Sequence, residues 1–484
     1  MKKFFIYAFL LLSVISCKKQ LTQTPSNALS VSQAFVNPSD FTYAILGAYG
    51  EFRGIGTTSL SSVYYGGADG GSMAITPDVL ADNLILTQQG RRSEVAFYNY
   101  KYTGNNTWTM WGDAYTVILS ANEVLANLGK LSSGTFKSNI RAEALAIRAL
   151  AHFDLLRLYA KSYTSASSTD LGVPYVTSID NTLLPSRTPV KQAYDLVVLD
   201  LKGADSSIAM DNGKGRFNKA SVEGLLSRVY LYRGEWQNAV NSATASLSNV
   251  LPANTLADTT QFKNIWTDAT EADVLFKIPI PDADNITIGV GYEQSNNGSV
   301  RSEYNIDYGF YLLYANNDVR KSAYIDTTTF SGAKYNYIKK YFGRGSGNAN
   351  TNDYKVLRVG EVLLNRAEAN YNLGNLTAAL ADLNTLRANR YIGFNPAIGN
   401  ETGIALYNAI LLQRRLELAF EGARFFDLKR LNLPIMRSNY GDLADGSGVP
   451  AVVQMVPAGS PLFQLPIPQA EINVNKNIVQ NPGY

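Results

Sequence analysis

Two glutamates near the C-terminal end of the chain have the spacing of a catalytic carboxylate pair. Glu417 and Glu421 are four residues apart, so on one helix their side chains would lie on the same face. Two carboxylates about 5 to 9.5 Å apart serve a glycosidase as acid and as nucleophile or base. Arg414, Arg415 and Arg424 lie in the same stretch, however, and guanidinium neighbours lower the pKa that a general acid needs raised. The pattern favours a helix held by ion pairs, and we predict no catalytic residue.

The chain has one histidine and one cysteine among 484 residues. His152 lies in an apolar stretch, which favours a packed or hydrogen-bonded core residue. With a single histidine, imidazole metal sites and Ser-His or Cys-His nucleophile systems lack the groups they require. The glycines at 343–347 lack the lysine and following Ser/Thr of a phosphate-binding loop. We therefore expect no metal, no cofactor and no enzymatic activity.

Aromatic side chains in loop-like segments are well suited to binding a sugar. Sugars present apolar C–H faces that pack against Tyr or Trp rings, while their hydroxyls pair with polar side chains. Thirty of the residues are tyrosines, and the candidates are those in segments rich in Gly, Asn and Ser. The predicted ligand-binding residues are Tyr64, Tyr65, Tyr98, Tyr100 and Tyr292.

The N-terminus has the pattern of an export signal that ends at a cysteine. Lys2 and Lys3 precede an apolar stretch, which has the length of a secretory signal and is too short to remain as a membrane-spanning helix. Small and aliphatic residues then lead to Cys17, and this order resembles the lipobox of bacterial lipoproteins. We predict a signal peptide over 1–16, lipidation of Cys17 and a lipidated tether over 17–30. The alternative is a structural cysteine behind an ordinary signal peptide.

The charge balance argues against a nucleic-acid partner. The chain has 43 Lys and Arg against 40 Asp and Glu, a net charge of +3. Such a balance gives no electrostatic footprint for nucleic acid. After the signal, no segment has the roughly 18 consecutive apolar residues that a spanning helix needs. Membrane contact is therefore expected through the lipid alone.

Helical patterns alternate with long irregular stretches along the rest of the chain. Apolar residues at helical spacing predict helices over 39–53, 108–128, 140–160 and 190–208. The third is apolar on nearly every side, which predicts a buried central helix.

Two later stretches, 223–247 and 361–386, resemble each other. In both, an apolar helix reaches a glycine, Gly234 or Gly374, and an alanine follows five residues later within a second helix. Glycine permits a tight reversal, and the small alanine lets the two helices pack closely. This spacing is typical of tetratricopeptide repeats, whose helix pairs bury their faces by stacking. The alternative is two unrelated helical hairpins.

Two long regions, 54–107 and 252–352, are rich in Gly, Asn, Ser, Thr and Tyr. They include a strand-like run over 274–280. Loops this long inside a compact protein are usually functional, so ligand binding is expected there.

Taken together and in order, several motifs resemble the SusD/RagB family of outer-membrane nutrient-binding lipoproteins. The order of the motifs behind a lipidation signal is specific, although each motif alone is weak. After the lipobox the motifs are Trp111-Gly-Asp-Ala-Tyr115, RAEALAIRALAHFDLLRLYA (141–160), Leu171-Gly-Val-Pro174, RTPVKQAYDLVVLDL (187–201), GRFNKASVEGLLSRVYLYRGEW (215–236), LRVGEVLLNRAEA (357–369), RRLELAFEGARFFDLKR (414–430) and LPIPQAEINVNKNIVQNPGY (465–484).

The resemblance implies a mainly α fold, in which about four tetratricopeptide-like helix pairs form a scaffold for a loop-rich ligand-binding half with a few short strands. It implies a single fold over 31–484, with an N-terminal part over 31–235 and a C-terminal part over 236–484. It also implies non-enzymatic capture of a glycan or oligosaccharide at the outer membrane and delivery to a SusC-type TonB-dependent transporter. We expect a lipid-anchored, surface-exposed protein, although Lys18 and Lys19 stand where many surface-exposed members have acidic residues.

Two alternatives to glycan capture remain open. The chain could be a member of the same family that binds peptides or other nutrients. It could also be a lipid-anchored tetratricopeptide scaffold that binds only proteins.

Overall fold

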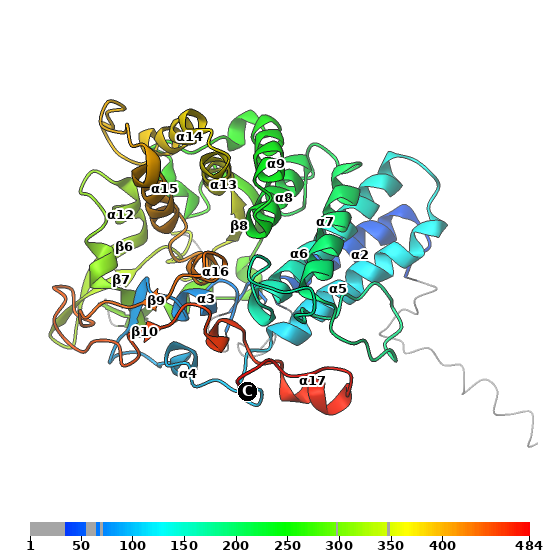
Figure 1. The fold of residues 1–484 in the computed structure, drawn as a ribbon, viewed down its shortest axis with the longest axis horizontal. Coiled ribbons are helices and arrows are strands. Elements are labelled where there is room, and N and C mark those ends of the chain that lie inside the picture. Colours follow the sequence, from blue (N-terminus) through cyan, green and yellow to red (C-terminus); the bar gives the residue numbers. More distant parts are fainter. Residues whose placement is uncertain (1–33, 55–63, 68–70, 297–298, 346–348) are drawn as a thin grey trace, which may run out of the picture.

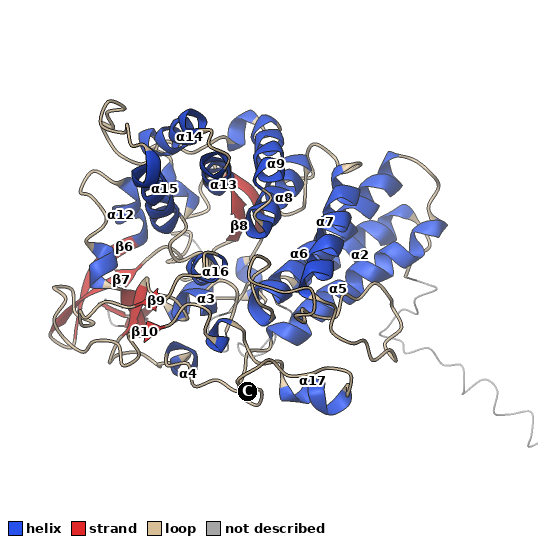
Figure 2. Cartoon of the chain, viewed as in Figure 1, coloured by secondary structure: helices blue, strands red, loops and turns tan. Residues whose placement is uncertain are grey.

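The computed structural model describes residues 34–54, 64–67, 71–296, 299–345 and 349–484. Helices account for 45% of the described residues and strands for 9%, which confirms the predicted mainly α class (Figures 1 and 2). Among the described residues, none of the helices combines the length and the hydropathy needed to cross a membrane. The signal peptide, the tether and Cys17 lie outside the described residues, so lipidation of Cys17 stays a prediction.

The long helices pack as four pairs within the described chain, as the family resemblance implies. Successive pairs contact each other and follow one another across the molecule, from α2 at the right of Figure 1 to α14 at the upper left. A further helix, α15 (Gly403–Glu417), packs on α13. The pairs are α2 (Pro38–Glu51) with α5 (Met110–Asn127), α6 (Thr135–Tyr159) with α7 (Val190–Asp205), α8 (Lys219–Arg233) with α9 (Trp236–Ser248), and α13 (Val359–Asn372) with α14 (Leu376–Ala388).

Local sequence explains where the two repeat-like pairs begin and turn. Asn218 caps α8, because its side chain accepts from the Ser221 amide at 3.1 Å while the Ser221 hydroxyl accepts from the Asn218 amide. Gly234 and Gly374 follow α8 and α13 in the left-handed conformation, with φ of 70° and 81°. A side chain there would be strained, so glycine makes both reversals possible.

The remaining elements are short and form the loop-rich half. The strands lie mostly toward the left and lower left of Figure 2. The main sheet is antiparallel, with β1 (Leu84–Leu86), β5 (Tyr304–Ile306), β7 (Ala333–Ile338) and β6 (Ile325–Phe330) in that order. Three two-stranded sheets pair β2 (Val274–Ile278) with β8 (Tyr354–Arg358), β3 (Gln294–Asn296) with β4 (Ser299–Arg301), and β9 (Ile435–Met436) with β10 (Met455–Val456).

The other helices are short. The α-helical ones are α3 (Thr76–Val79), α4 (Val95–Tyr98), α10 (Phe262–Ile265), α11 (Tyr308–Tyr311), α12 (Val319–Tyr324), α16 (Arg424–Arg430) and α17 (Gln469–Val474). The 3-10 turns are η1 (Leu128–Lys130), η2 (Pro252–Asn254), η3 (Asp282–Asp284), η4 (Ile288–Gly291) and η5 (Pro461–Phe463).

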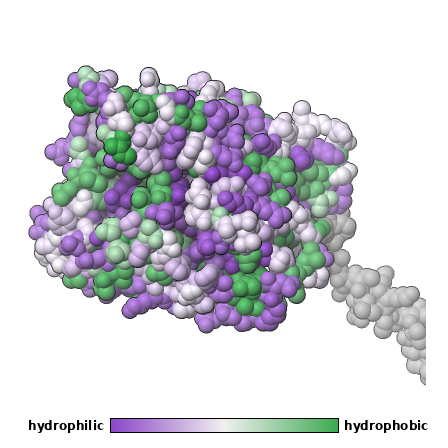
Figure 3. All heavy atoms as spheres, viewed as in Figure 1, coloured by the Kyte–Doolittle hydropathy of each residue, from purple (hydrophilic) through white to green (hydrophobic). Residues whose placement is uncertain are grey.

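One hydrophobic core extends through both the helical scaffold and the loop-rich half. Its buried residues run from Phe35 to Ile478, and β1 from the N-terminal part pairs with β5 from the C-terminal part. On the surface, hydrophobic and hydrophilic residues are interspersed over the face seen in Figure 3. The loop-rich half is therefore packed onto the helices by a shared core.

The central helix α6 is buried from 142 to its end, as its composition predicts. His152 is fully buried in it: the His152 Nδ1 lies 2.9 Å from the Arg148 carbonyl, and Nε2 accepts from the Val176 amide at 3.0 Å. The ring stacks on Tyr175 with 3.8 Å between centroids. Burial, together with the charge of Arg148, lowers the His152 pKa to about 3. The prediction of a hydrogen-bonded core histidine is confirmed.

We predict that His152 makes the fold less stable in acid. The ordinary pKa is 6.5 and the folded pKa is about 3, so between these values the unfolded state binds a proton that the folded state does not. The free energy of unfolding therefore falls as the pH falls below the unfolded pKa, by about 2 kcal/mol between pH 7 and pH 5. His152→Gln lacks this contribution. The free energies of unfolding of the wild type and of His152→Gln should be measured by urea titration at pH 7 and at pH 5. The difference between the two proteins should be about 2 kcal/mol smaller at pH 5, and the same difference at both pH values would contradict the assignment.

Candidate functional site

The structure buries the tyrosines predicted to bind ligand. Tyr64, Tyr65, Tyr98 and Tyr292 have exposed fractions of 0 to 2%, and Tyr100 is partly buried against the core. All five side chains therefore pack in or against the hydrophobic core.

Except in Tyr98, the hydroxyls of these tyrosines bind the protein itself. Tyr64 and Tyr65 both donate to Asp154, at 3.0 and 2.5 Å, and their rings stack on each other with centroids 4.8 Å apart. Tyr292 donates to the Ala74 carbonyl at 3.3 Å. These placements do not fit a sugar-binding surface. The physical reason is that the loops carrying them fold inward against distant segments, and loop composition gives no signal of that.

A different group of tyrosines lies at the surface of the loop-rich half, and we call Tyr308, Tyr311 and Tyr440 the tyrosine face. Tyr308 and Tyr311 are half-buried on α11, and their rings stack with centroids 5.9 Å apart and planes 18° apart. Tyr440, 43% exposed, follows β9 and meets Tyr308 edge to face at 5.0 Å. Three adjoining rings therefore form one aromatic surface open to solvent.

The tyrosine face is supported from beneath by residues distant in sequence. Asp307 caps α11 by accepting from the Phe310 amide at 2.9 Å, and it accepts from the Ser438 hydroxyl at 2.5 Å. Gly446 has a φ of 83° and lies so close that a Cβ there would be 2.5 Å from the Tyr308 ring and 2.8 Å from the Tyr440 ring. Only glycine fits this contact, so the rings are held in place by the 438–446 segment.

The tyrosine face also carries free polar groups. Within the described chain, the hydroxyls of Tyr308, Tyr311 and Tyr440 make no hydrogen bond to protein. The Lys321 ammonium lies 4.7 Å from the Tyr311 ring centroid and donates to the Asn316 side chain at 3.2 Å. Flat apolar rings flanked by donors and acceptors are what a sugar ring and its hydroxyls require. The aromatic run YGFYLLY at 308–314, directly after a capping aspartate, is the signal that could have identified this surface.

The carboxylate pair is not on one helix, which corrects the geometry expected from its spacing. Helix α15 ends at Glu417, and Glu421 lies beyond a left-handed Phe420 with a φ of 61°. Glu421 pairs with Lys340 at 2.7 Å and with Arg358 at 2.6 Å.

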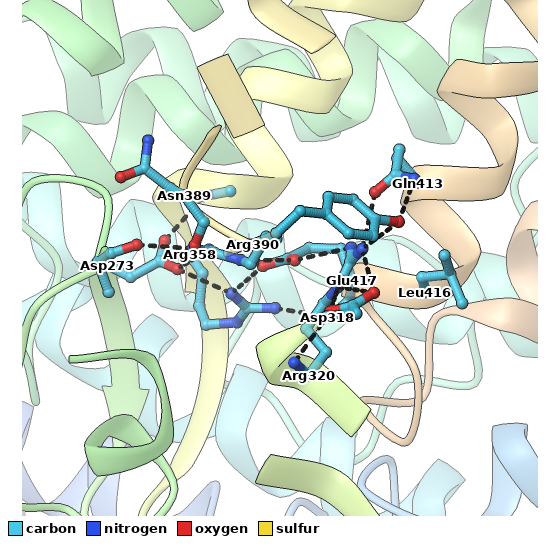
Figure 4. A network of polar contacts seen from close by, with 12 residues as sticks. Asp273, Asp318, Arg320, Arg358, Asn389, Arg390, Gln413, Leu416 and Glu417 are labelled. Carbon is cyan, nitrogen blue, oxygen red and sulfur yellow. Dashed lines mark hydrogen bonds and ion pairs between the residues drawn. The ribbon is translucent and has the colours of Figure 1, made fainter. Parts of the chain in front are cut away.

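Glu417 lies in a buried network of arginines and carboxylates (Figure 4). It accepts from Arg390 Nε at 2.9 Å and from Arg358 Nη1 at 2.8 Å, and Arg320 lies 3.4 Å away. Arg358 and Arg390 also reach Asp273, at 3.0 and 2.7 Å. Burial raises the pKa of Glu417, but the charges of Arg390 and Arg358 outweigh burial and hold that pKa well below its usual range. An ionised, fully enclosed carboxylate cannot act as a general acid.

The arginines expected to neighbour Glu417 pair elsewhere. Arg414 contacts Asp427 at 2.8 Å, and Arg424 contacts Asp82 at 2.7 Å. The ion-paired role predicted for this stretch is thus correct, with different partners. Among the described residues, His, Cys, Asp and Glu side chains do not gather into a group of three or more that could hold a metal.

We predict that Glu417→Gln destabilises the fold through the arginines left without a counter-charge. Removing one partner of a buried ion pair costs about 3 to 5 kcal/mol, and the change should appear as a lower urea midpoint. The matched control is Glu271→Gln, because the Glu271 side chain is 49% exposed in its pair with Lys277 and should cost less than about 1 kcal/mol. Equal effects of the two substitutions would contradict the structural role of Glu417.

Comparisons with known proteins agree with this architecture. Residues 285–484 match the model of the SusD family, and residues 63–231 match a model described as starch-binding associating with outer membrane. SusD-like protein P2 of Formosa agariphila is 27% identical, with 100% of each chain covered.

Solved structures share the fold. A candidate sugar binding protein of Bacteroides vulgatus is 26% identical with a TM-score of 0.81, covering 93% of this chain and 99% of its own. A SusD superfamily protein of Bacteroides thetaiotaomicron, also 26% identical, has a TM-score of 0.78 and covers 92% of this chain and 100% of its own. With helix pairs, loop-rich half and sequence motifs all in agreement, the chain belongs to the SusD/RagB family.

Proposed function

We propose that this chain captures a glycan or oligosaccharide at the outer membrane without transforming it and delivers it to a SusC-type TonB-dependent transporter. The observation that carries the proposal is the tyrosine face, where three adjoining rings and their hydroxyls stand free at the surface of the loop-rich half. Stacking on rings holds many sugars without cleaving them, which suits capture and release.

The relatives support a sugar as the ligand. The Bacteroides vulgatus structure that shares the fold is described as a candidate sugar binding protein. The family model matched by residues 63–231 is described as starch-binding and associating with outer membrane. A non-enzymatic role is supported by the ionised, enclosed state of Glu417.

The membrane anchor and the transporter complete the proposal. The lipobox-like order before Cys17 supports lipidation there, with the tether joining the lipid to the helical body. A stacked-helix scaffold offers the extended surface that a protein partner requires, and the transporter is proposed as that partner.

We predict that Tyr308→Ala and Tyr440→Ala weaken glycan binding. Each removes one ring of a stacking surface worth about 0.5 to 1.5 kcal/mol beyond its area, so each should lower affinity about 2-fold to 10-fold and the double variant more. The measurement is calorimetry with an oligosaccharide selected from a panel of neutral and acidic glycans. The control is Tyr43→Ala, because Tyr43 is 71% exposed on α2 in the helical scaffold.

The outcomes separate the competing functions. Unchanged binding in both face variants, or equal loss in Tyr43→Ala, would remove the tyrosine face as the site. If no glycan in the panel bound but a peptide mixture did, the chain would be a peptide-binding member of the family. Binding to the transporter alone would favour a protein-binding scaffold.

We predict that Cys17→Ser releases the protein from the membrane. Without the thiol, no acyl chain can be attached, and the anchored fraction should move to the soluble fraction on ultracentrifugation. The wild-type N-terminal peptide should begin at Cys17 and carry the mass of a lipid. Ser26→Ala, within the tether, is the control and should stay with the membrane. An unmodified Cys17 in the mature wild-type protein would overturn lipidation.

A further inference from the structure

A cavity of about 160 Å³ lies where the end of α6 meets the C-terminal segments. Lys161, Ser162 and Ser165 follow α6, Lys429 belongs to α16, and Gln464 follows η5. We call this the basic cavity, because two lysines and no carboxylate are among the described residues that line it. It is separate from the tyrosine face, with which it shares no residue.

Lys429 is the central feature of the basic cavity. The residue is only 9% exposed, and its ammonium donates to the Arg157 carbonyl at 2.6 Å. Among the described residues it forms no ion pair. Two of its three N–H groups have no acceptor within the part of the chain that the structure describes. A buried charge without a counter-charge is costly.

The surroundings of Lys429 are positive rather than negative. A small cavity of about 10 Å³ joins Lys429 to Arg157 and Arg430, and Lys161 lies at the rim with 41% of its side chain exposed. The nearby carboxylates are already committed: Asp170 pairs with Lys161 at 2.7 Å, and Asp427 pairs with Arg430 at 2.8 Å. Burial, followed by the charge of Arg157, lowers the Lys429 pKa to about 7.

Neutral hydrogen-bonding groups complete the lining. Gln464 is 9% exposed, and within the described chain its side-chain amide has no protein partner. The hydroxyls of Ser162 and Ser165 lie 2.6 Å apart and can donate outward once a ligand arrives. The basic cavity thus offers more donors than acceptors, together with one uncompensated ammonium.

We propose that the basic cavity binds a small oxyanion, a carboxylate, sulfate or phosphate group, with Lys429 as its counter-charge and Gln464 as a donor. One water occupies about 30 Å³ in the liquid, so the cavity has room for a group of four or five heavy atoms with a few waters. The oxyanion is either a free ion or an acidic substituent carried by a sugar, and the site is independent of sugar stacking on the tyrosine face.

Binding should depend on pH with a defined sign. The oxyanion stabilises the protonated form of Lys429, so binding takes up a proton above the free pKa of about 7. Affinity for sulfate and for a carboxylate, whose own charges do not change in this range, should therefore fall as the pH rises from 6 to 9. The other titratable groups that line the cavities around Lys429 are Lys161, Arg157, Arg430, Tyr194 and Tyr232. The two arginines stay charged and the two tyrosines stay neutral through this range, because the pKa of each is raised.

The test is calorimetry on the mature full-length chain at constant ionic strength. The probes are sulfate, inorganic phosphate and glucuronate, with glucose as the uncharged match for glucuronate. Lys429→Met should weaken oxyanion binding about 10-fold to 100-fold, the usual effect of losing a charge-assisted hydrogen bond. The control is Lys476→Met, because Lys476 is exposed, follows α17 and donates to the Ile472 carbonyl of that helix.

A second variant, Gln464→Leu, and a second readout, proton uptake on binding, test the same site independently. Gln464→Leu should weaken the same ligand, and titration in two buffers of different ionisation enthalpy should show proton uptake at pH 8. Uptake that persists in Lys429→Met would overturn the assignment of Lys429. Absence of binding by all three anions, or binding unaffected by both variants, would overturn the site.

The same experiment separates the two sources of the oxyanion and the two sites. Sulfate or phosphate binding supports a free ion, whereas glucuronate binding alone supports an acidic sugar. Because Tyr308→Ala should leave oxyanion binding unchanged, failure of the basic cavity and failure of glycan capture remain distinguishable.

Discussion

The structure depends on pairing buried arginine charges with buried carboxylates where distant elements meet. Arg358 ends β8, Arg390 follows α14 and Glu417 ends α15, so their contacts join three elements at one point. Asp273, next to β2, closes the group by accepting from both arginines and from the Gly360 amide at 2.8 Å. Since a buried charge without a partner costs several kcal/mol, these elements can hardly shift separately. The network fixes the loop-rich half onto the last helix pair.

Buried ion pairs of the same kind also join the helices of the scaffold. Arg148 of α6 binds Asp200 of α7 through two 2.7 Å contacts, and Arg228 of α8 binds Glu361 of α13 at 2.6 Å. Such pairs add little net stability over apolar residues of similar size, because desolvation offsets the attraction. Their effect is on register: each arginine fits one carboxylate in one geometry. The stacking order of the pairs is therefore specified by charge as well as by the small residues between helices.

The sequence was informative where structure follows from local pattern and misleading where it follows from distant packing. The helix predicted over 190–208 is α7, Val190–Asp205, and the turn at Gly234 depends on a backbone conformation that glycine favours. By contrast, whether Tyr64 faces solvent or Asp154 depends on contacts across 90 residues, which composition cannot report. The tyrosine face was missed for the same reason: Tyr440 meets Tyr308 only because the 438–446 segment folds back onto α11.

One segment, 435–464, positions both candidate sites, and Arg437 explains how it is held. Arg437 is buried, and its guanidinium donates to the carbonyls of Val79, Ala81 and Tyr98 at 2.7 to 3.0 Å. It lies 3.7 Å from the Tyr98 ring centroid and reaches the Tyr100 hydroxyl at 3.3 Å. Tyr98 and Tyr100, which were predicted to contact ligand, therefore contact Arg437 and help to hold the 435–464 segment in place. Arg437 thus anchors the start of the 435–464 segment to the 79–98 region through backbone carbonyls. From this anchored start, residues 438–446 support the tyrosine face and residues 459–464 line the basic cavity.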